Sequence, residues 1–339
     1  MKKRHISKNG LRCLFLIGIM AILSVFFSFA APGFLSINTF INVIRQNTSL
    51  AILSLGVTFI IMLAGTDLST GSTIAFAGAV GAFFMQMAEG MGVFQAVIGF
   101  AATCAGGILI GALNGLMIGI CKVSAFMVTL ATMSLARGLT IFITNSRRIV
   151  VENEIYNWFG QGEITVFGID IPCSLILLLV LFFIMHFVLT KTTFGRKTEA
   201  IGGNATAARA SGIRVKRHTA SVYLLGGLFA GLAAIVTVGR ARSAQPLAGQ
   251  GVEFDAITAV VIGGTSLSGG RGSLSGAVLG AMLTGLIFSG LGMMSISSNY
   301  TYIVKGALII LAVWMDGCAD RMSARVKTRK EAESAQGCV

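Results

Sequence analysis

Long apolar runs, separated by short polar connections, follow one another along most of the chain. A helix needs about 20 apolar residues to cross the hydrocarbon core of a bilayer, and the longer runs approach or exceed that length. The pattern therefore predicts an all-α fold, a polytopic membrane helical bundle of about ten transmembrane helices, at residues 12–31, 47–65, 69–88, 93–120, 124–145, 173–190, 218–239, 253–267, 273–294 and 299–315.

Composition supports the membrane assignment and excludes a soluble domain. Of the 339 residues, 55% are hydrophobic and 12% are charged, whereas about 25% of the residues of a soluble domain are charged. A single core cannot bury so much apolar sequence, so lipid must solvate most of it. The formal net charge of +13 does not indicate a nucleic-acid partner, because the basic residues lie between the apolar runs.

The distribution of lysine and arginine sets the predicted orientation, since cytoplasmic loops are enriched in these residues. If the N-terminus is cytoplasmic, the outer segments hold few of them, namely Arg45, Arg147, Arg148, Arg240 and Arg242. Both termini are therefore predicted to be cytoplasmic. The boundaries are a cytoplasmic N-terminal segment at 1–11, a transmembrane domain at 12–315 and a cytoplasmic tail at 316–339. The largest outer segment is 146–172, and a multi-pass protein of the bacterial inner membrane is expected.

The largest internal connection, residues 191–217, is strongly basic, and Glu199 is its single acidic residue. Asn204 is a favourable N-cap, and Gly212 is typical of the position that follows a helix C-cap. The small residues between them predict a short amphipathic helix in a cytoplasmic loop between two spans.

Residues 65–72, Gly-Thr-Asp-Leu-Ser-Thr-Gly-Ser, place a carboxylate and several hydroxyls within an apolar sequence. An ionisable side chain in a membrane is costly unless it faces a polar cavity or a partner. One interpretation is a broken helix whose N–H groups and hydroxyls line a substrate path, as in discontinuous transporter spans. The other is that Asp67 and Ser69 only cap the third helix. The two are compatible, and both stay open.

Arg137 and Lys305 each lie inside an apolar run. A charge at such depth must pair, line water or extend to the interface. Asp67 and Asp255 are candidate partners of Arg137, and the alternative is a structural ion pair or a side chain that reaches the membrane surface. Glu253 and Asp255 open the eighth run, where they would contact a substrate or partner, or act as an acidic pair favoured by the helix dipole.

Two further patterns concern packing and internal symmetry. Glycines spaced by four residues share one helix face and allow close approach of a neighbouring helix, and they lie at Gly107, Gly111, Gly115 and Gly119.

Residues 63–72 also resemble residues 262–273. Transporters often contain internal repeats, but both copies run in the same direction in the predicted topology, so they do not form a clean inverted repeat.

The sequence offers no catalytic pattern. Residues 202–205 lack the lysine of a phosphate-binding loop, and neither an HExxH motif nor a nucleophile elbow occurs. The six cysteines have no metal-ligand spacing and are interpreted as small hydrophobes rather than disulfide partners. The chain is therefore predicted not to be an enzyme, and no metal or cofactor is expected.

Four ordered motifs, at residues 65–72, 126–132, 200–213 and 259–273, resemble the ribose-type sugar permeases of ABC transporters. The match runs from about residue 35 to 315, and the same superfamily includes branched-chain amino acid permeases. The resemblance implies the permease subunit of an ATP-driven importer that moves a monosaccharide, a ribose-type pentose or a related sugar, across the inner membrane. It also implies three partners: a cytoplasmic ATP-binding subunit, a periplasmic sugar-binding protein, and a second copy or a similar permease that completes a dimer within membrane lipid.

The resemblance further implies that the loop at 191–217 docks the ATPase, through Gly202, Gly203, Asn204, Ala208, Arg209 and Gly212. A neutral, polar sugar requires hydroxyls, amides and small residues along its path rather than a fixed charge. The candidate path residues are Asp67, Ser69, Thr70, Ser72, Thr73, Asn114, Ser266 and Ser268.

Three other classes of protein give different expectations. An ion-coupled secondary transporter requires acidic residues deep in several spans, and Asp67 is the one candidate. A branched-chain amino acid permease shares the superfamily and differs in substrate. A membrane scaffold or enzyme subunit predicts no flux of solute. Uptake that survives an uncoupler but needs ATP distinguishes the importer from the secondary transporter.

Overall fold

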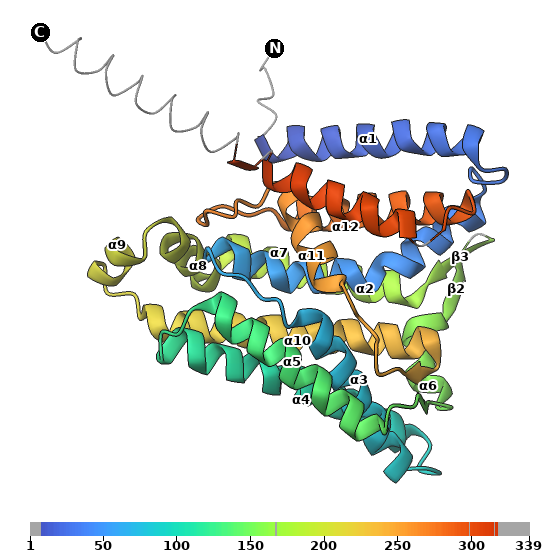
Figure 1. The fold of residues 1–339 in the computed structure, drawn as a ribbon, viewed down its shortest axis with the longest axis horizontal. Helices are drawn as coiled ribbons and strands as arrows, with labels where there is room; N and C mark the ends of the chain where they lie inside the picture. The colour runs from blue at the N-terminus through green and yellow to red at the C-terminus, as the bar shows by residue number, and fades with distance from the viewer. Residues whose placement is uncertain (1–7, 167, 298, 315, 318–339) are drawn as a thin grey trace, which may run out of the picture.

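The computed structural model describes residues 8–317 except 167, 298 and 315, so most of the predicted segments 1–11 and 316–339 lies outside the described residues. The described chain forms a helical bundle (Figure 1). Its elements are, in order, α1 (Lys8–Ala30), α2 (Ile37–Met62), α3 (Thr70–Met87), α4 (Val93–Gly115), the π-helix η1 (Leu116–Ile120), α5 (Ala125–Thr144), β1 (Ile149–Val150), α6 (Glu154–Gln161), β2 (Glu163–Val166), β3 (Ile169–Pro172), α7 (Cys173–Lys191), α8 (Thr193–Gly203), α9 (Ala205–Ala210), α10 (Val215–Ala241), β4 (Ser243–Ala244), α11 (Val252–Ile262) and α12 (Leu274–Met293). A last helix follows at Asn299–Trp314.

Seven of the described helices are long and apolar enough to cross a membrane, namely α1, α2, α4 with η1, α5, α7, α10 and α12. The polytopic helical bundle is therefore confirmed. The predicted spans 69–88, 253–267 and 299–315 correspond to α3, α11 and the last helix, which fall outside this set of seven. α3 opens on the polar sequence Thr-Gly-Ser-Thr, and α11 has only 11 residues. A total of ten membrane crossings stays a prediction.

The second helix differs from its predicted span at both ends. α2 begins at Ile37 instead of residue 47, where the hydroxyl of Ser36 accepts a hydrogen bond from Thr39 N at 3.1 Å. Its first turns carry the polar residues Asn38, Asn42, Arg45 and Gln46, which lower the local hydropathy, so hydropathy alone places the start too late. The helix ends at Met62 because Ala64 adopts a left-handed conformation with φ of 56°. Few non-glycine residues do so, and such a residue cannot continue a right-handed helix.

Short strands close one end of the bundle, here called the α6 end, which lies opposite α8 and α9 (Figure 1). β1 pairs with β4 in antiparallel register, with Ile149 opposite Ala244. β2 and β3 form a hairpin in which Glu163 lies opposite Pro172. Apart from these two small pairs the described fold is helical, as the sequence predicts.

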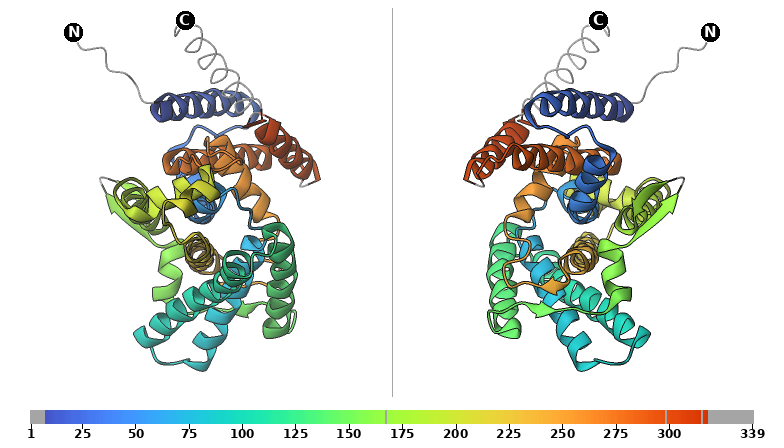
Figure 2. Two further views of the ribbon diagram at one scale, coloured as in Figure 1. Left: turned by 90° about the vertical axis from the view of Figure 1, so that its left-hand side faces the viewer. Right: turned by 90° about the vertical axis from the view of Figure 1, so that its right-hand side faces the viewer.

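α2 and α10 lie in the middle of the bundle (Figure 2), and they run antiparallel, since Gln46 near the start of α2 contacts Arg240 near the end of α10. At the α6 end Ser49 Oγ lies 2.7 Å from Thr237 Oγ1, and deeper in the bundle Gly56 packs against Phe229. α1 lies at the edge and packs on α12, and most of its large apolar side chains are exposed. Side chains inside the bundle therefore pack against other helices of the protein, whereas most large apolar side chains of α1 face outward.

The four glycines of α4 and η1 pack directly on α10. A Cβ at Gly107 would meet the carbonyl of Gly227, and one at Gly115 would meet the carbonyl of Ala220. The predicted role of this ridge in close helix packing is confirmed.

The bundle contains two similar halves that run in opposite directions. In each half a long helix is followed by an irregular segment, a shorter helix and two more helices: α2 to α5 in the first, and α10 to the last helix in the second. α2 packs on α12, and α10 packs on α4. The sequence resemblance between 63–72 and 262–273 does not mark this repeat, since those segments lie side by side at the α8 end, where Gly270 N donates to the Met62 carbonyl at 2.9 Å.

Candidate functional site

Asp67 is the centre of a buried polar cluster in the break between α2 and α3. Its Oδ1 accepts hydrogen bonds from Ser69 N at 2.8 Å and from Ser69 Oγ at 2.6 Å. Asn114 of α4 donates to Ser69 Oγ at 2.9 Å, and its Oδ1 accepts from Thr132 of α5 at 2.8 Å. A buried polar group must find its hydrogen-bond partners inside the protein. This cluster therefore holds the break against α4 and α5 and forms a local turn at the start of α3.

The remaining path residues fall into two groups. Thr70, Ser72 and Thr73 lie buried in the first turn of α3, and Thr73 Oγ1 donates to the Ser69 carbonyl at 2.8 Å. The Thr70 hydroxyl is buried without a hydrogen-bond partner among the described residues. Ser266 and Ser268 lie in a separate segment between α11 and α12, where Ser268 N donates to Ser266 Oγ at 3.3 Å.

The N-termini of α3 and α11 meet in the interior. A Cβ at Gly71 would overlap the Glu253 carboxylate and the Gly249 carbonyl, so the two helix starts are in direct contact. Arg137 of α5 anchors the segment before α11, because its Nη1 donates to the carbonyls of Pro246 at 2.7 Å and Ala248 at 2.9 Å. The predicted pairing of Arg137 with Asp67 or Asp255 is therefore wrong.

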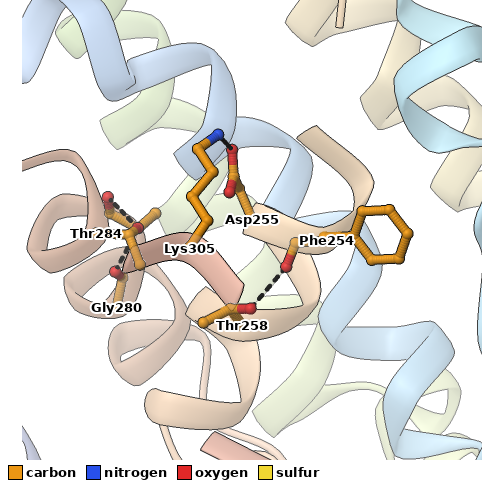
Figure 3. Close-up of polar contacts among 7 residues, drawn as sticks. Phe254, Asp255, Thr258, Gly280, Thr284 and Lys305 are labelled. Carbon is orange, nitrogen blue, oxygen red and sulfur yellow. Dashed lines mark hydrogen bonds and ion pairs between the residues drawn. The ribbon is translucent and has the colours of Figure 1, made fainter. Parts of the chain in front are cut away.

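Lys305 of the last helix is the partner of Asp255 (Figure 3). Lys305 Nζ lies 2.6 Å from Asp255 Oδ2 and 4.7 Å from the centre of the Phe288 ring. For Lys305, the structure therefore supports the structural ion pair, which was one of the alternatives predicted for a cation inside an apolar run. Glu253 and Asp255 both lie in the first turn of α11 and are buried, as expected of an acidic pair at a helix N-terminus.

α8 and α9 form the predicted basic segment at the other end of the bundle. Asn204 Oδ1 accepts from Ala207 N at 2.9 Å, and Gly212 has a φ of 83°. Both capping predictions are confirmed, and the short helix spans Ala205–Ala210. Ala208 is buried, whereas the basic residues of this segment are exposed, namely Lys191, Arg196, Lys197, Arg209, Arg214, Lys216 and Arg217.

The C-terminal end of α8 packs on the segment that follows α2 and on the segment between α11 and α12. A Cβ at Gly202 would overlap the Met62 carbonyl oxygen and approach Gly270 N. One at Gly269 would meet the Gly202 carbonyl and the side chain of Ala64. This glycine junction joins α8 to the end of α2 and to the segment before α12. A displacement of α8 therefore acts on both segments at once.

Gly202→Ala is expected to lower the stability of the protein by about 1–3 kcal/mol, since overpacking a close backbone contact forces the backbone apart. Gly203→Ala is the matched control, because a Cβ at Gly203 meets nothing within 4 Å. Thermal unfolding of the two purified variants in detergent measures the difference. A Gly202→Ala protein as stable as the Gly203→Ala protein would contradict the tight junction.

Described cysteines at positions 13, 104, 121 and 173 are free thiols, and Cys318 and Cys338 lie outside the described residues. Within the described ranges no group of three His, Cys, Asp or Glu side chains is placed to hold a metal ion.

The discontinuous helices, the buried polar cluster and the exposed basic segment together define a membrane transport protein of the permease class. Comparison with known proteins agrees: residues 39–313 match the family of the branched-chain amino acid transport system permease component. The chain belongs to this family, and it is a multi-pass inner-membrane protein. No solved structure gives a significant match.

Curated relatives align over almost the whole chain. The ribose import permease protein of Escherichia coli strain K12 is 39% identical over 313 residues, which cover 91% of this chain and 92% of the relative. The D-allose transport system permease protein of the same strain is 34% identical, with 87% of this chain and 88% of the relative aligned. The corresponding xylose permease is 33% identical, with 93% of this chain and 94% of the relative aligned.

Asp67, Ser69 and Asn114 were predictable from the sequence, but several residues that hold them in place were not. Thr132 ends the 126–132 motif, so its position gave a usable signal. Tyr223 gave no signal in the sequence. Its hydroxyl donates a hydrogen bond to the Thr66 carbonyl at 3.2 Å and so helps to hold the break between α2 and α3. The contact between α3 and α11 was also missed, because glycines carry no chemistry that marks a partner.

Proposed function

We propose that this chain is the membrane-spanning subunit of an ATP-driven importer that carries a monosaccharide, a ribose-type pentose or a related sugar, into the cell. The observation that carries the proposal is the alignment of nearly the whole chain with relatives named for ribose, allose and xylose. The energy would come from a cytoplasmic ATP-binding subunit. A periplasmic binding protein would deliver the sugar, and a second copy or a similar permease would complete a dimer.

The α8–α9 segment is the proposed docking site of the ATP-binding subunit. Its exposed basic side chains support a cytoplasmic position. In this proposed orientation both termini would be cytoplasmic and the α6 end would lie outside. Through Gly202 the segment contacts the end of α2 and the segment before α12. Closure of the ATP-binding subunits would move α8 and shift the bundle between outward- and inward-facing states. The shift requires that ATP bind one of these two states of the importer more tightly than the other.

The proposed sugar path passes the segment between α2 and α3 and the segment between α11 and α12. Asp67, Ser69 and Asn114 would hold its wall in shape. The unpartnered hydroxyl of Thr70, with Ser72 on the same turn, would offer hydrogen bonds as the helices part. Ser266 and Ser268 would line the inner end, beside the glycine junction. Neutral hydroxyl and amide groups of this kind suit a sugar, which has no charge to pair.

An ion-coupled mechanism is less well supported by the same residues. Ion sites need carboxylates that are available deep in the membrane. Asp67 uses its oxygens within the polar cluster, and Asp255 is paired with Lys305. The deciding measurement is uptake of ribose, allose and xylose by cells that express the complete importer. Uptake that persists with an uncoupler but stops on ATP depletion supports the proposal, and the reverse result supports ion coupling.

Arg209→Glu is expected to reduce uptake at least tenfold while the protein still reaches the membrane. Arg209 is exposed on α9, so the substitution by glutamate reverses a charge on the docking surface without disturbing the buried core. Gly203→Trp should act in the same way, because its Cβ points into open space. A pull-down of the tagged chain measures loss of the ATP-binding subunit. Normal uptake and normal co-purification in both variants would rule out this docking assignment.

A further inference from the structure

A cavity of about 240 Å³ lies at the α6 end of the bundle, between the first half of α3, the last turns of α10 and the segment that leads to α11. Typical sites for drug-sized ligands are larger, about 300–1,000 Å³. The cavity therefore suits a small molecule of the size of a single sugar ring. None of the residues named above for the path lines it.

The wall of this cavity is part polar and part apolar. Ile74, Ala75 and Val238 form an apolar side, and Thr237, Arg240, Ser243 and Gln245 supply polar groups. A monosaccharide has the matching character, since hydroxyls alternate with C–H groups around its ring. A few placed polar groups on an apolar wall are typical of small-molecule sites.

The polar groups have hydrogen-bonding capacity to spare. Arg240 Nη1 donates to the Gln46 carbonyl at 3.0 Å, which uses one of the five N–H donors of a guanidinium. The Ser243 hydroxyl donates to the Ala241 carbonyl at 3.1 Å and keeps its lone pairs as acceptors. The Gln245 side chain is exposed, and its amide makes no hydrogen bond with the residues that the structure describes. Donors and acceptors are thus both available to hydroxyl groups.

The inner side of the cavity is closed. Gly249 belongs to the cavity wall, and it also contacts Gly71 at the meeting point of α3 and α11. The Glu253 carboxylate blocks the same point. A molecule that enters from the α6 end therefore stops above this junction in the described conformation.

From this geometry we propose that the cavity is an outer binding site for a neutral monosaccharide, occupied before the junction of α3 and α11 opens. The proposal rests on the proposed function, because it assumes that a sugar reaches the α6 end. It adds Gln245, Arg240 and Ser243 as sugar contacts, and it makes Gly249 and Gly71 the inner barrier of that site.

Thiol protection tests occupancy directly. Gln245→Cys and Gln250→Cys form a matched pair, since both glutamines are exposed in one loop and only Gln245 lines the cavity. The complete importer in intact cells is treated with a membrane-impermeant thiol reagent, with and without the sugar that the wild-type importer transports, and the wild-type chain gives the background from native cysteines. The sugar should slow labelling of Gln245→Cys at least threefold and leave Gln250→Cys unchanged. Equal labelling with and without sugar, or no labelling of Gln245→Cys from outside, would overturn the proposal.

Transport by conservative variants separates this site from the function on which it rests. Gln245→Leu keeps the approximate side-chain volume and removes the amide, so uptake should fall at least fivefold, whereas Gln250→Leu should match wild type. Normal uptake by Gln245→Leu would refute the site and leave the importer intact. Failure of the wild-type importer to take up ribose, allose or xylose would instead refute the proposed function.

Discussion

Lys305→Met is expected to destabilise the protein by about 3–5 kcal/mol, because it leaves the buried carboxylate of Asp255 without its cation. The side chains of Lys305 and Asp255 are only 25% and 11% exposed, and the two charged atoms are 2.6 Å apart. Methionine preserves most of the length of the lysine stem and its packing near Phe288. The loss therefore reports the missing charge, and thermal unfolding of the purified protein measures it.

Two further variants make this result interpretable. Lys191→Met changes an exposed lysine at the end of α7 and should leave stability unchanged. Lys305→Met combined with Asp255→Leu should recover most of the loss, since an apolar pair can replace a buried ion pair at little cost. If Lys305→Met alone is as stable as wild type, the ion pair contributes nothing to the attachment of the last helix.

Asp67→Ala is expected to have a second large effect. It leaves Ser69 N and Ser69 Oγ without the acceptor that both now use. Each buried group left unsatisfied costs about 1–3 kcal/mol, so stability should fall by roughly 2–6 kcal/mol and uptake should fall with it. Unfolding of the purified protein and uptake per folded molecule are the two measurements.

Asp67→Asn gives a graded comparison. Its Oδ1 still accepts from Ser69, but its amide places a donor opposite the Nδ2 of Asn114, which now lies 3.4 Å from Asp67 Oδ2. The loss should be smaller than for Asp67→Ala. Asp170→Ala, which removes an exposed carboxylate of β3, is the control and should be nearly neutral, because its hydrogen bond with Thr165 lies at the surface. Wild-type stability and uptake in Asp67→Ala would make the carboxylate a spectator.

Features that depend on neighbours along the chain could be predicted from sequence. Asn204 and Gly212 act within one turn of α9, so their identity was sufficient. The glycine ridge was also predictable, because a spacing of four fixes a helix face. Its partner was not, since the ridge gives no sign that Gly227 of α10 lies opposite.

Features that depend on distant segments could not be predicted in the same way. The acceptors of Arg137 are backbone carbonyls, which every residue carries, so no carboxylate marked them. α2 starts earlier than predicted because its first turns are polar, and hydropathy cannot separate a polar helical turn from a connecting loop. The opposed halves were hidden for a related reason: they share a helix order and a packing pattern rather than a clear sequence repeat.

The antiparallel pairing of α2 with α10 has a consequence for biosynthesis. Ribosomes deliver the chain from its N-terminus, so α2 is complete long before its main partner exists. The contacts of Ser49 with Thr237, and of the Gln46 carbonyl with Arg240, join residues that are synthesised far apart in time. Pairings of high sequence separation form slowly. The first half must therefore wait in the bilayer with polar groups of α2 uncovered, and we expect nascent chains that stop before α10 to be preferred substrates of membrane quality-control proteases.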